Sequence, residues 1–193
     1  RSMEDEDLQM IEAVLQGNQP AFQQLVERYQ HFVFTIALRI VKSREEAEEV
    51  AQDVFLKVYK TLGQFEKKSK FSTWLYTVAW RTSIDQARRK QILTDSIDDE
   101  EGAFWQIATP DETPLQAVQH SDLQQQLQQA IQQLRPDDAA LITLYYLNEK
   151  SVKEIADITG LTETNIKTKL YRTRELLREY LDAQLQEEIK DML

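Results

Sequence analysis

Apolar side chains recur at helical spacing through the first half of the chain. The pattern predicts a short helix over 5–16 and longer helices over about 21–41 and 44–62, followed by an amphipathic stretch over 65–90. Spacings of three and four residues place side chains on one face of a helix, whereas a strand requires strict alternation. We therefore predict that these residues form a set of packed helices.

The helical pattern breaks in the middle of the chain. Residues 92–122 hold eight acidic side chains and no lysine or arginine. Pro110 and Pro114 preclude a continuous helix through this segment. We interpret 93–114 as an acidic linker, and we expect its apolar cluster at 104–107 to dock on one of the domains or on a partner.

The second half of the chain contains a helix-turn-helix pattern. Ser151 and Glu154 have the spacing of a capping box, Gly160 suits a tight turn, and Thr162 can cap a second helix. Residues 162–178 carry five basic against two acidic side chains. A short helix, a glycine turn and a capped cationic helix are typical of a protein that reads duplex DNA in the major groove. The alternative is two ordinary helices with a cationic face.

The linker separates two helical domains. We predict that they extend over 5–92 and over 115–193. The chain has only four glycines and four prolines, and its hydrophobic content of 41% is enough for packed cores. The predicted fold class is all-α: two small helical domains joined by an acidic linker, the C-terminal one containing a helix-turn-helix.

The stretch 65–90 is basic, unlike the chain as a whole. It holds seven basic and two acidic residues, although the whole chain has a net charge of −10. Aromatic rings at Phe71, Trp74, Tyr76 and Trp80 lie among these cations. Cations track a phosphate backbone and rings stack on unpaired bases, so the combination favours a platform for single-stranded nucleic acid. The competing interpretation places the rings in the core and the cations in a salt ladder on a solvated face.

Other classes of function find little support in the composition. There are no cysteines, and His31 and His120 lie in separate segments without metal-ligand spacing. No glycine-rich phosphate loop occurs, so we predict no metal, no cofactor, no small-molecule substrate and no enzymatic activity. No apolar run approaches the about 20 residues of a membrane span, and the N-terminus lacks a signal-peptide core. We therefore expect a cytoplasmic protein without membrane insertion.

Four segments carry the motifs of a known family: AFQQLVERYQ at Ala21, EEVAQDVFLKVYKTLGQF at Glu48, FSTWLYTVA at Phe71 and SVKEIADITGLTETNIKTKLYRTRELL at Ser151. In this order they resemble the bacterial RNA polymerase sigma factors of the extracytoplasmic-function (ECF) group. The resemblance covers 5–181, with the linker matching least. It implies a transcription initiation factor that binds core RNA polymerase, directs it to −35/−10 promoters and assists promoter opening.

The resemblance also implies roles for individual residues. The polymerase clamp would bind the exposed face of the third helix through Glu49, Gln52, Asp53 and Leu56. The −10 element would be melted and read by Lys67, Lys68, Lys70, Trp74, Thr77, Arg81 and Arg88. The −35 element would be read by Thr164, Asn165, Lys167, Thr168, Lys169, Tyr171, Arg172 and Arg174. The acidic linker resembles the family's connector toward the polymerase active centre and RNA exit path.

The sequence departs from the family pattern at DNA-reading positions. Many relatives have Asn in place of Arg81 and Gly or Asp in place of Lys67 and Lys68, and arginine is frequent where this chain has Lys167 and Lys169. Lysine lacks the bidentate fork of arginine, so the promoter sequence cannot be transferred from relatives. Relatives are commonly inhibited by an anti-sigma factor, which is therefore an expected partner. The alternative function is a helix-turn-helix regulator that binds duplex DNA without polymerase.

Overall fold

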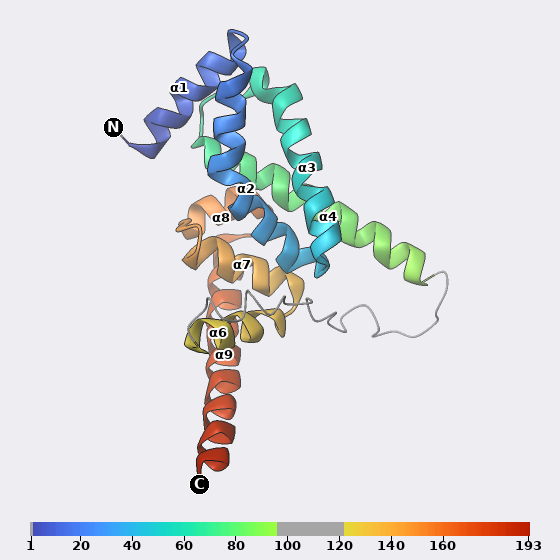
Figure 1. The fold of residues 1–193 in the computed structure, drawn as a ribbon, viewed down its shortest axis with the longest axis vertical. Helices are drawn as coiled ribbons and strands as arrows, with labels where there is room; N and C mark the ends of the chain where they lie inside the picture. The colour runs from blue at the N-terminus through green and yellow to red at the C-terminus, as the bar shows by residue number, and fades with distance from the viewer. Residues whose placement is uncertain (1, 96–121) are drawn as a thin grey trace.

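The computed structural model describes residues 2–95 and 122–193. All regular structure in these two ranges is helical, which confirms the all-α fold class (Figure 1). The elements are α1 (Met3–Leu15), α2 (Gln19–Val41), α3 (Arg44–Thr61), the short 3-10 helix η1 (Leu62–Gln64), α4 (Phe71–Asp95), α6 (Asp122–Gln132), α7 (Pro136–Tyr146), α8 (Val152–Thr159) and α9 (Glu163–Met192).

Side-chain caps fix the starts of several helices. The hydroxyls of Ser2, Ser43 and Thr162 accept hydrogen bonds from amides in the first turns of α1, α3 and α9. Ser151 and Glu154 form a complete capping box at α8. Such caps stabilise a helix because its first amides have no partner within the helix. The caps expected from the sequence at Ser151 and Thr162 are confirmed.

The first unit is built on α2, α3 and α4, which pack against one another around fully buried side chains such as Val33, Val54 and Leu75. α1 lies across α2, where the buried carboxylate of Asp7 accepts a hydrogen bond from the Tyr29 hydroxyl. Burial raises the pKa of Asp7, against the opposing effects of Tyr29 and Arg28. The first helix is therefore tied to the bundle by a buried polar contact as well as by apolar packing.

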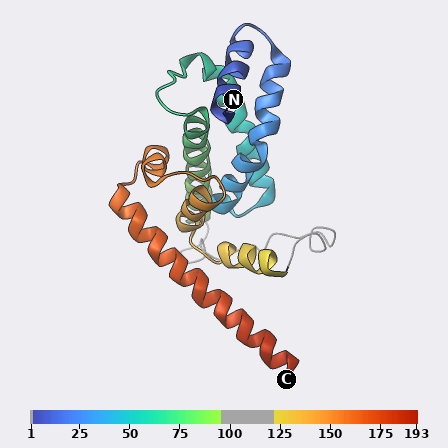
Figure 2. The same cartoon turned by 90° about the vertical axis from the view of Figure 1, so that its left-hand side faces the viewer.

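The second unit contains the helix-turn-helix. α8 and α9 are joined at Gly160, which adopts the left-handed conformation with a φ of 77°. Ile155, Ile166 and Leu170 are buried between the two helices and α7. α9 continues for 30 residues and extends well beyond the rest of the structure, as Figure 2 shows.

The two units pack directly on each other. α7 packs on α2 and α8 packs on α4, and the buried apolar residues of both units form one continuous cluster. The C-terminal end of α4 extends to Asp95, inside the segment predicted as linker. The apolar cluster at 104–107 and the predicted start of the second domain at 115 lie outside the described residues.

Candidate polymerase and promoter interfaces

The residues predicted to bind polymerase lie together on α3. Glu49, Gln52, Asp53 and Leu56 are exposed and line one shallow groove between α3 and α4. Leu56 is 58% exposed, which is unusual for a large apolar side chain and suits a docking surface. Asp53 lies 3.5 Å from Lys57, but both side chains are at least half exposed, so this ion pair is weak and easily exchanged.

The predicted single-strand loop precedes α4. Lys67 has a φ of 61°, a left-handed conformation that is uncommon for a residue with a β-carbon. Its three lysines all face carboxylates of the same chain. Lys67 pairs with Glu12 of α1 at 3.4 Å, Lys68 pairs with Glu66 at 2.7 Å, and Lys70 lies 3.8 Å from Glu154 of α8.

Aromatic side chains that flank this loop in the sequence pack against one another. The ring of Trp74 is half-buried, with centroids 5.3 Å from Phe65 and 6.0 Å from Phe71. Trp74 is therefore neither a free stacking platform nor a fully buried core residue. One part of its ring is held by the neighbouring rings and another part remains accessible.

The remaining predicted −10 residues continue along α4. Arg81 and Arg88 are exposed, whereas Thr77 is half-buried and donates a hydrogen bond to the carbonyl of Thr73 at 2.8 Å. Within 2–95 and 122–193, neither arginine is ion-paired, so the salt ladder considered for this face is not formed at Arg81. These two guanidinium groups are available for a phosphate backbone.

The recognition helix presents most of its predicted residues to solvent. Seven are exposed: Thr164, Asn165, Lys167, Thr168, Tyr171, Arg172 and Arg174. Lys169 differs, because its side chain is only 19% exposed and pairs with Asp137 of α7 at 2.9 Å. That contact, with desolvation acting in the opposite direction, lowers the pKa of Asp137. Lys169 thus holds α9 on α7 in this structure.

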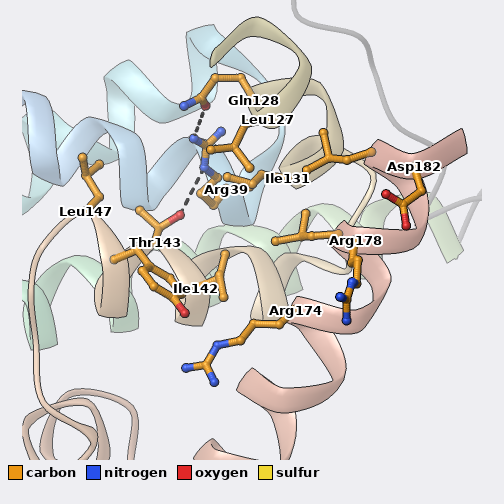
Figure 3. Close-up of a pocket in the computed structure, with 13 residues that line it drawn as sticks. Arg39, Leu127, Gln128, Ile131, Ile142, Thr143, Leu147, Arg174, Arg178 and Asp182 are labelled. Atoms are coloured by element: carbon orange, nitrogen blue, oxygen red, sulfur yellow. Dashed lines mark hydrogen bonds between the residues drawn. The ribbon is translucent and has the colours of Figure 1, made fainter. Parts of the chain in front are cut away.

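Arg174 also has a partner within its own domain. Its guanidinium lies over the rings of Tyr145 and Tyr146, 5.4 and 5.5 Å from their centroids. Figure 3 shows it at the edge of a cavity between α2, α6, α7 and α9. Stacking on both rings directs the charge of Arg174 toward α7.

The same cavity contains a cation that the sequence analysis missed. Arg39 of α2 is 4% exposed and donates hydrogen bonds to Thr143 of α7 and Gln128 of α6 (Figure 3). Burial lowers the pKa of Arg39 to about 10. A signal was present in the sequence, since an arginine interrupts the apolar run between Leu38 and Ile40.

Other kinds of site receive no support from the described residues. In those ranges, no group of three His, Cys, Asp or Glu side chains is placed to hold a metal ion. Across the same residues, no helix has both the length and the apolar character to cross a membrane.

The geometry defines a class of protein. One unit presents a lysine loop over an aromatic cluster, the other presents an exposed cationic helix in a helix-turn-helix, and both are joined in one chain. These are features of proteins that bind single-stranded and duplex nucleic acid, respectively.

Comparison with known proteins gives the family. The profile of Sigma-70 region 2 matches residues 25–92, and that of Sigma-70, region 4 matches residues 124–177. The chain is 33% identical over 176 residues to the ECF RNA polymerase sigma factor SigW of Bacillus subtilis (strain 168), covering 89% of this chain and 94% of the relative. It is 31% identical over 189 residues to the RNA polymerase sigma-H factor of Pseudomonas aeruginosa, covering 95% of this chain and 98% of the relative.

A solved structure has the same fold. The sigma factor RpoE in complex with the anti-sigma factor NepR from Bartonella quintana superimposes with a TM-score of 0.70 at 24% identity, covering 83% of this chain and 96% of that one.

The chain therefore belongs to the bacterial RNA polymerase sigma factors, and within them to the ECF group. It is a transcription initiation factor that binds core RNA polymerase, directs it to −35/−10 promoters and assists promoter opening. A regulator acting through the helix-turn-helix alone would leave the match to region 2 unexplained.

Proposed function

We propose that three surfaces of the chain bind core polymerase, the −10 element and the −35 element, respectively. The observation that carries the proposal is the presence, in one chain, of an accessible lysine loop on an aromatic support and an exposed cationic recognition helix. In this assignment 5–92 binds polymerase and the −10 element, 115–193 binds the −35 element, and 93–114 connects them.

Polymerase binding is assigned to the α3 groove. Glu49, Gln52 and Asp53 supply carboxylate and amide groups, and exposed Leu56 supplies an apolar contact in the same groove. An exposed leucine surrounded by polar groups is a common composition for a protein–protein contact.

Recognition of the −10 element is assigned to the loop and the exposed side of α4. Lys67, Lys68 and Lys70 bind phosphates around a flipped base, and the accessible part of Trp74 stacks on a neighbouring base. Unstacking a base costs a few kcal/mol, and a pocket with stacking contacts offsets that cost. Thr77, Arg81 and Arg88 extend the contact along the strand.

Recognition of the −35 element is assigned to the exposed side of α9. Thr164, Asn165, Lys167, Thr168, Tyr171 and Arg172 face solvent together and can reach base edges and phosphates in the major groove. Lys169 and Arg174 contribute only if they exchange their present partners for DNA.

An anti-sigma factor is a further proposed partner. Support comes from the shared fold with a sigma factor solved in complex with the anti-sigma factor NepR. We assign the protein to the cytoplasm, where its polymerase is found, and assign it no cofactor, no small-molecule substrate and no catalytic activity of its own.

The test is run-off transcription with purified core polymerase on a promoter library. We expect promoter-dependent transcripts only when the protein is added, and footprints at both elements of the selected promoters. Failure to bind core polymerase together with tight binding to duplex DNA would instead favour a regulator that acts alone.

A further inference from the structure

Lys169 differs from its neighbour Lys167 in the side of the recognition helix on which it lies. Successive residues of an α-helix are about 100° apart around its axis, so these two lysines are roughly 200° apart. Lys167 is exposed, whereas Lys169 is half-buried and follows the buried Ile166 by three residues. When Lys167 faces the major groove, Lys169 therefore faces away from it.

Two carboxylates of α7 lie close to the ammonium group of Lys169. Its Nζ atom donates a hydrogen bond to Asp137 at 2.9 Å and lies 4.0 Å from the Oδ1 atom of Asp138. That Oδ1 atom is buried, and among the described residues it has no hydrogen-bond partner. A buried carboxylate is costly unless a nearby opposite charge stabilises it. Lys169 supplies such a charge, so one cation serves both carboxylates.

The position of these carboxylates follows from the start of α7. Pro136 begins the helix, and Asp137 and Asp138 occupy its first turn, where the helix dipole favours negative charge. The next two residues, Ala139 and Ala140, are buried, so this turn is fixed to the core of the second unit. The carboxylates are thus held on a rigid support against α9.

The same carboxylates act on a second cation of the recognition helix. Burial and the charge of Asp137 raise the pKa of Asp138, against the opposing charges of Lys169 and Arg172. Arg172 is exposed and follows Lys169 by nearly one helical turn. The carboxylates therefore attract one edge of α9, between its buried side and the side assigned to DNA.

An ion pair at this edge restrains the rotation of α9 about its own axis. Apolar packing is non-directional and tolerates small rotations, whereas a hydrogen bond weakens steeply with distance and angle. On a helix of about 5 Å radius, a rotation of about 20° moves a side-chain tip by roughly 2 Å. Such a shift would break the 2.9 Å contact between Lys169 and Asp137. The ion pair therefore determines which residues of α9 face outward.

We propose that Asp137 and Asp138 are positioning residues for −35 recognition, holding Lys169 as an anchor that stays on α7 when DNA is bound and fixes the rotation of the recognition helix. Lys169 then neither reads a base nor neutralises a phosphate, although it lies within that helix. The proposal rests on the assignment of α9 as the reader of the −35 element, and it removes one lysine from the residues that contact DNA.

Charge exchange separates an anchor from a DNA contact. Asp137→Lys and Lys169→Glu each replace the ion pair by repulsion. In the complex with core polymerase, we expect each variant to lose at least about tenfold in preference for an intact over a scrambled −35 element, because like charges in contact cost several kcal/mol. The double variant restores an ion pair of opposite polarity, and its preference should return to within about threefold of the unmodified chain. Fluorescence anisotropy with labelled promoter DNA measures the affinities.

Lys167→Glu is the matched control. It makes the same charge change on the exposed side of α9, and Asp137→Lys should not restore the preference that it loses. Urea unfolding of the exchanged variants shows separately whether positions 137 and 169 are coupled in the folded chain. Coupling in stability without recovery of the −35 preference in the double variant would mean that the ion pair only stabilises the fold, and the proposal would be wrong.

Salt dependence gives a second readout with neutral substitutions, which decides the question even if a charge-reversed chain does not fold. Lys167→Gln should lower the slope of log affinity against log salt concentration by about one, because one fewer phosphate charge is neutralised. Lys169→Gln should leave the slope unchanged, since Asp137 already neutralises this lysine. An equal drop in both variants would show that Lys169 binds phosphate and is not an anchor.

The unmodified complex with core polymerase distinguishes this proposal from the proposed function. If it shows no preference for any −35 element, the assignment of α9 as a reader fails, and the anchor fails with it. If it shows a preference that the charge exchange does not restore, the reader assignment stands and the anchor is wrong.

Discussion

At the scale of single residues, Lys42 illustrates how the interface between the units responds to its surroundings. It occupies the left-handed C-cap of α2 and binds two carbonyls at the end of α6. Burial, with a contribution from nearby Arg39, lowers the pKa of Lys42 to about 8. The group thus becomes sensitive to pH in a range where an ordinary lysine, with a pKa of 10.5, is fully charged.

This shift gives a pH dependence with a defined sign. Between about pH 8 and 10.5 the unfolded chain binds more protons at Lys42 than the folded chain, so raising the pH stabilises the fold. We expect the free energy of unfolding in urea to increase from pH 7.5 to 9.5, and Arg39, whose pKa is lowered to about 10, adds to the increase at the upper end of this range. Lys42→Met should reduce the slope by up to one proton, and an unchanged slope would contradict the assignment.

A second residue-scale prediction concerns the polymerase groove. Asp53→Lys reverses a charge at an exposed position, so the helical content and melting temperature should be preserved. Affinity for core polymerase should fall at least about 100-fold, because like charges opposed in an interface cost several kcal/mol. Titration with labelled protein measures the affinity. Glu27→Lys, exposed on α2 away from the groove, is the matched control, and equal affinities of the two variants would contradict the assignment.

At the scale of elements, the turn between α8 and α9 determines how the recognition helix is presented. The chain must reverse direction within a few residues, and Gly160 does so in a left-handed conformation that a β-carbon disfavours. The capping box before α8 and the Thr162 cap after the turn fix both helix starts. The angle of the recognition helix therefore depends on backbone geometry at one position.

Gly160→Ala should destabilise the second unit by about 1–2 kcal/mol, since the left-handed conformation carries that cost for other residues. Nothing lies within 4 Å of the added methyl group, so the effect would be one of backbone conformation alone. Gly63→Ala is the control, because its φ is not positive and its new methyl group makes only an ordinary 3.9 Å contact with Leu15. Urea unfolding of both variants checks the difference.

At the scale of the whole molecule, the two units share one hydrophobic cluster across α2–α7 and α4–α8. Residues that are core in the packed form become partly exposed when the units separate. Separation and unfolding are therefore linked, because each unit loses apolar burial when its neighbour leaves.

The shared cluster implies a single cooperative unfolding transition for the intact chain. Calorimetry should show one peak whose van't Hoff and calorimetric enthalpies agree. Lys150, buried before α8, donates hydrogen bonds to Ser72 and Thr73 of α4, so in Lys150→Glu the units should melt independently, giving two peaks or one broadened peak. Two transitions in the unmodified protein would argue that the units do not pack in solution.

The sequence predicted the helices and both helix caps at the recognition motif because these features depend on local spacing. The assignment of residues to the three surfaces stays a prediction, and the structure shows only that most of these residues are exposed. It did not predict Lys169 as a contact to Asp137, or Arg39 and Lys150 as buried cations. These depend on which helices meet, and hydrophobic periodicity gives only the face of each helix that is buried.

The length of α9 has a mechanical consequence. Its 30 residues extend about 45 Å along one axis. The fully buried residues of α9 lie in its first half, and its second half contacts α6, where Gln126 donates a hydrogen bond to Glu188. Because the helix is stiff, a turn of the motif by about 10° would move its far end by roughly 8 Å relative to α6. A fluorescent reporter near Ile189 would therefore detect a small reorientation of the recognition motif as a larger displacement.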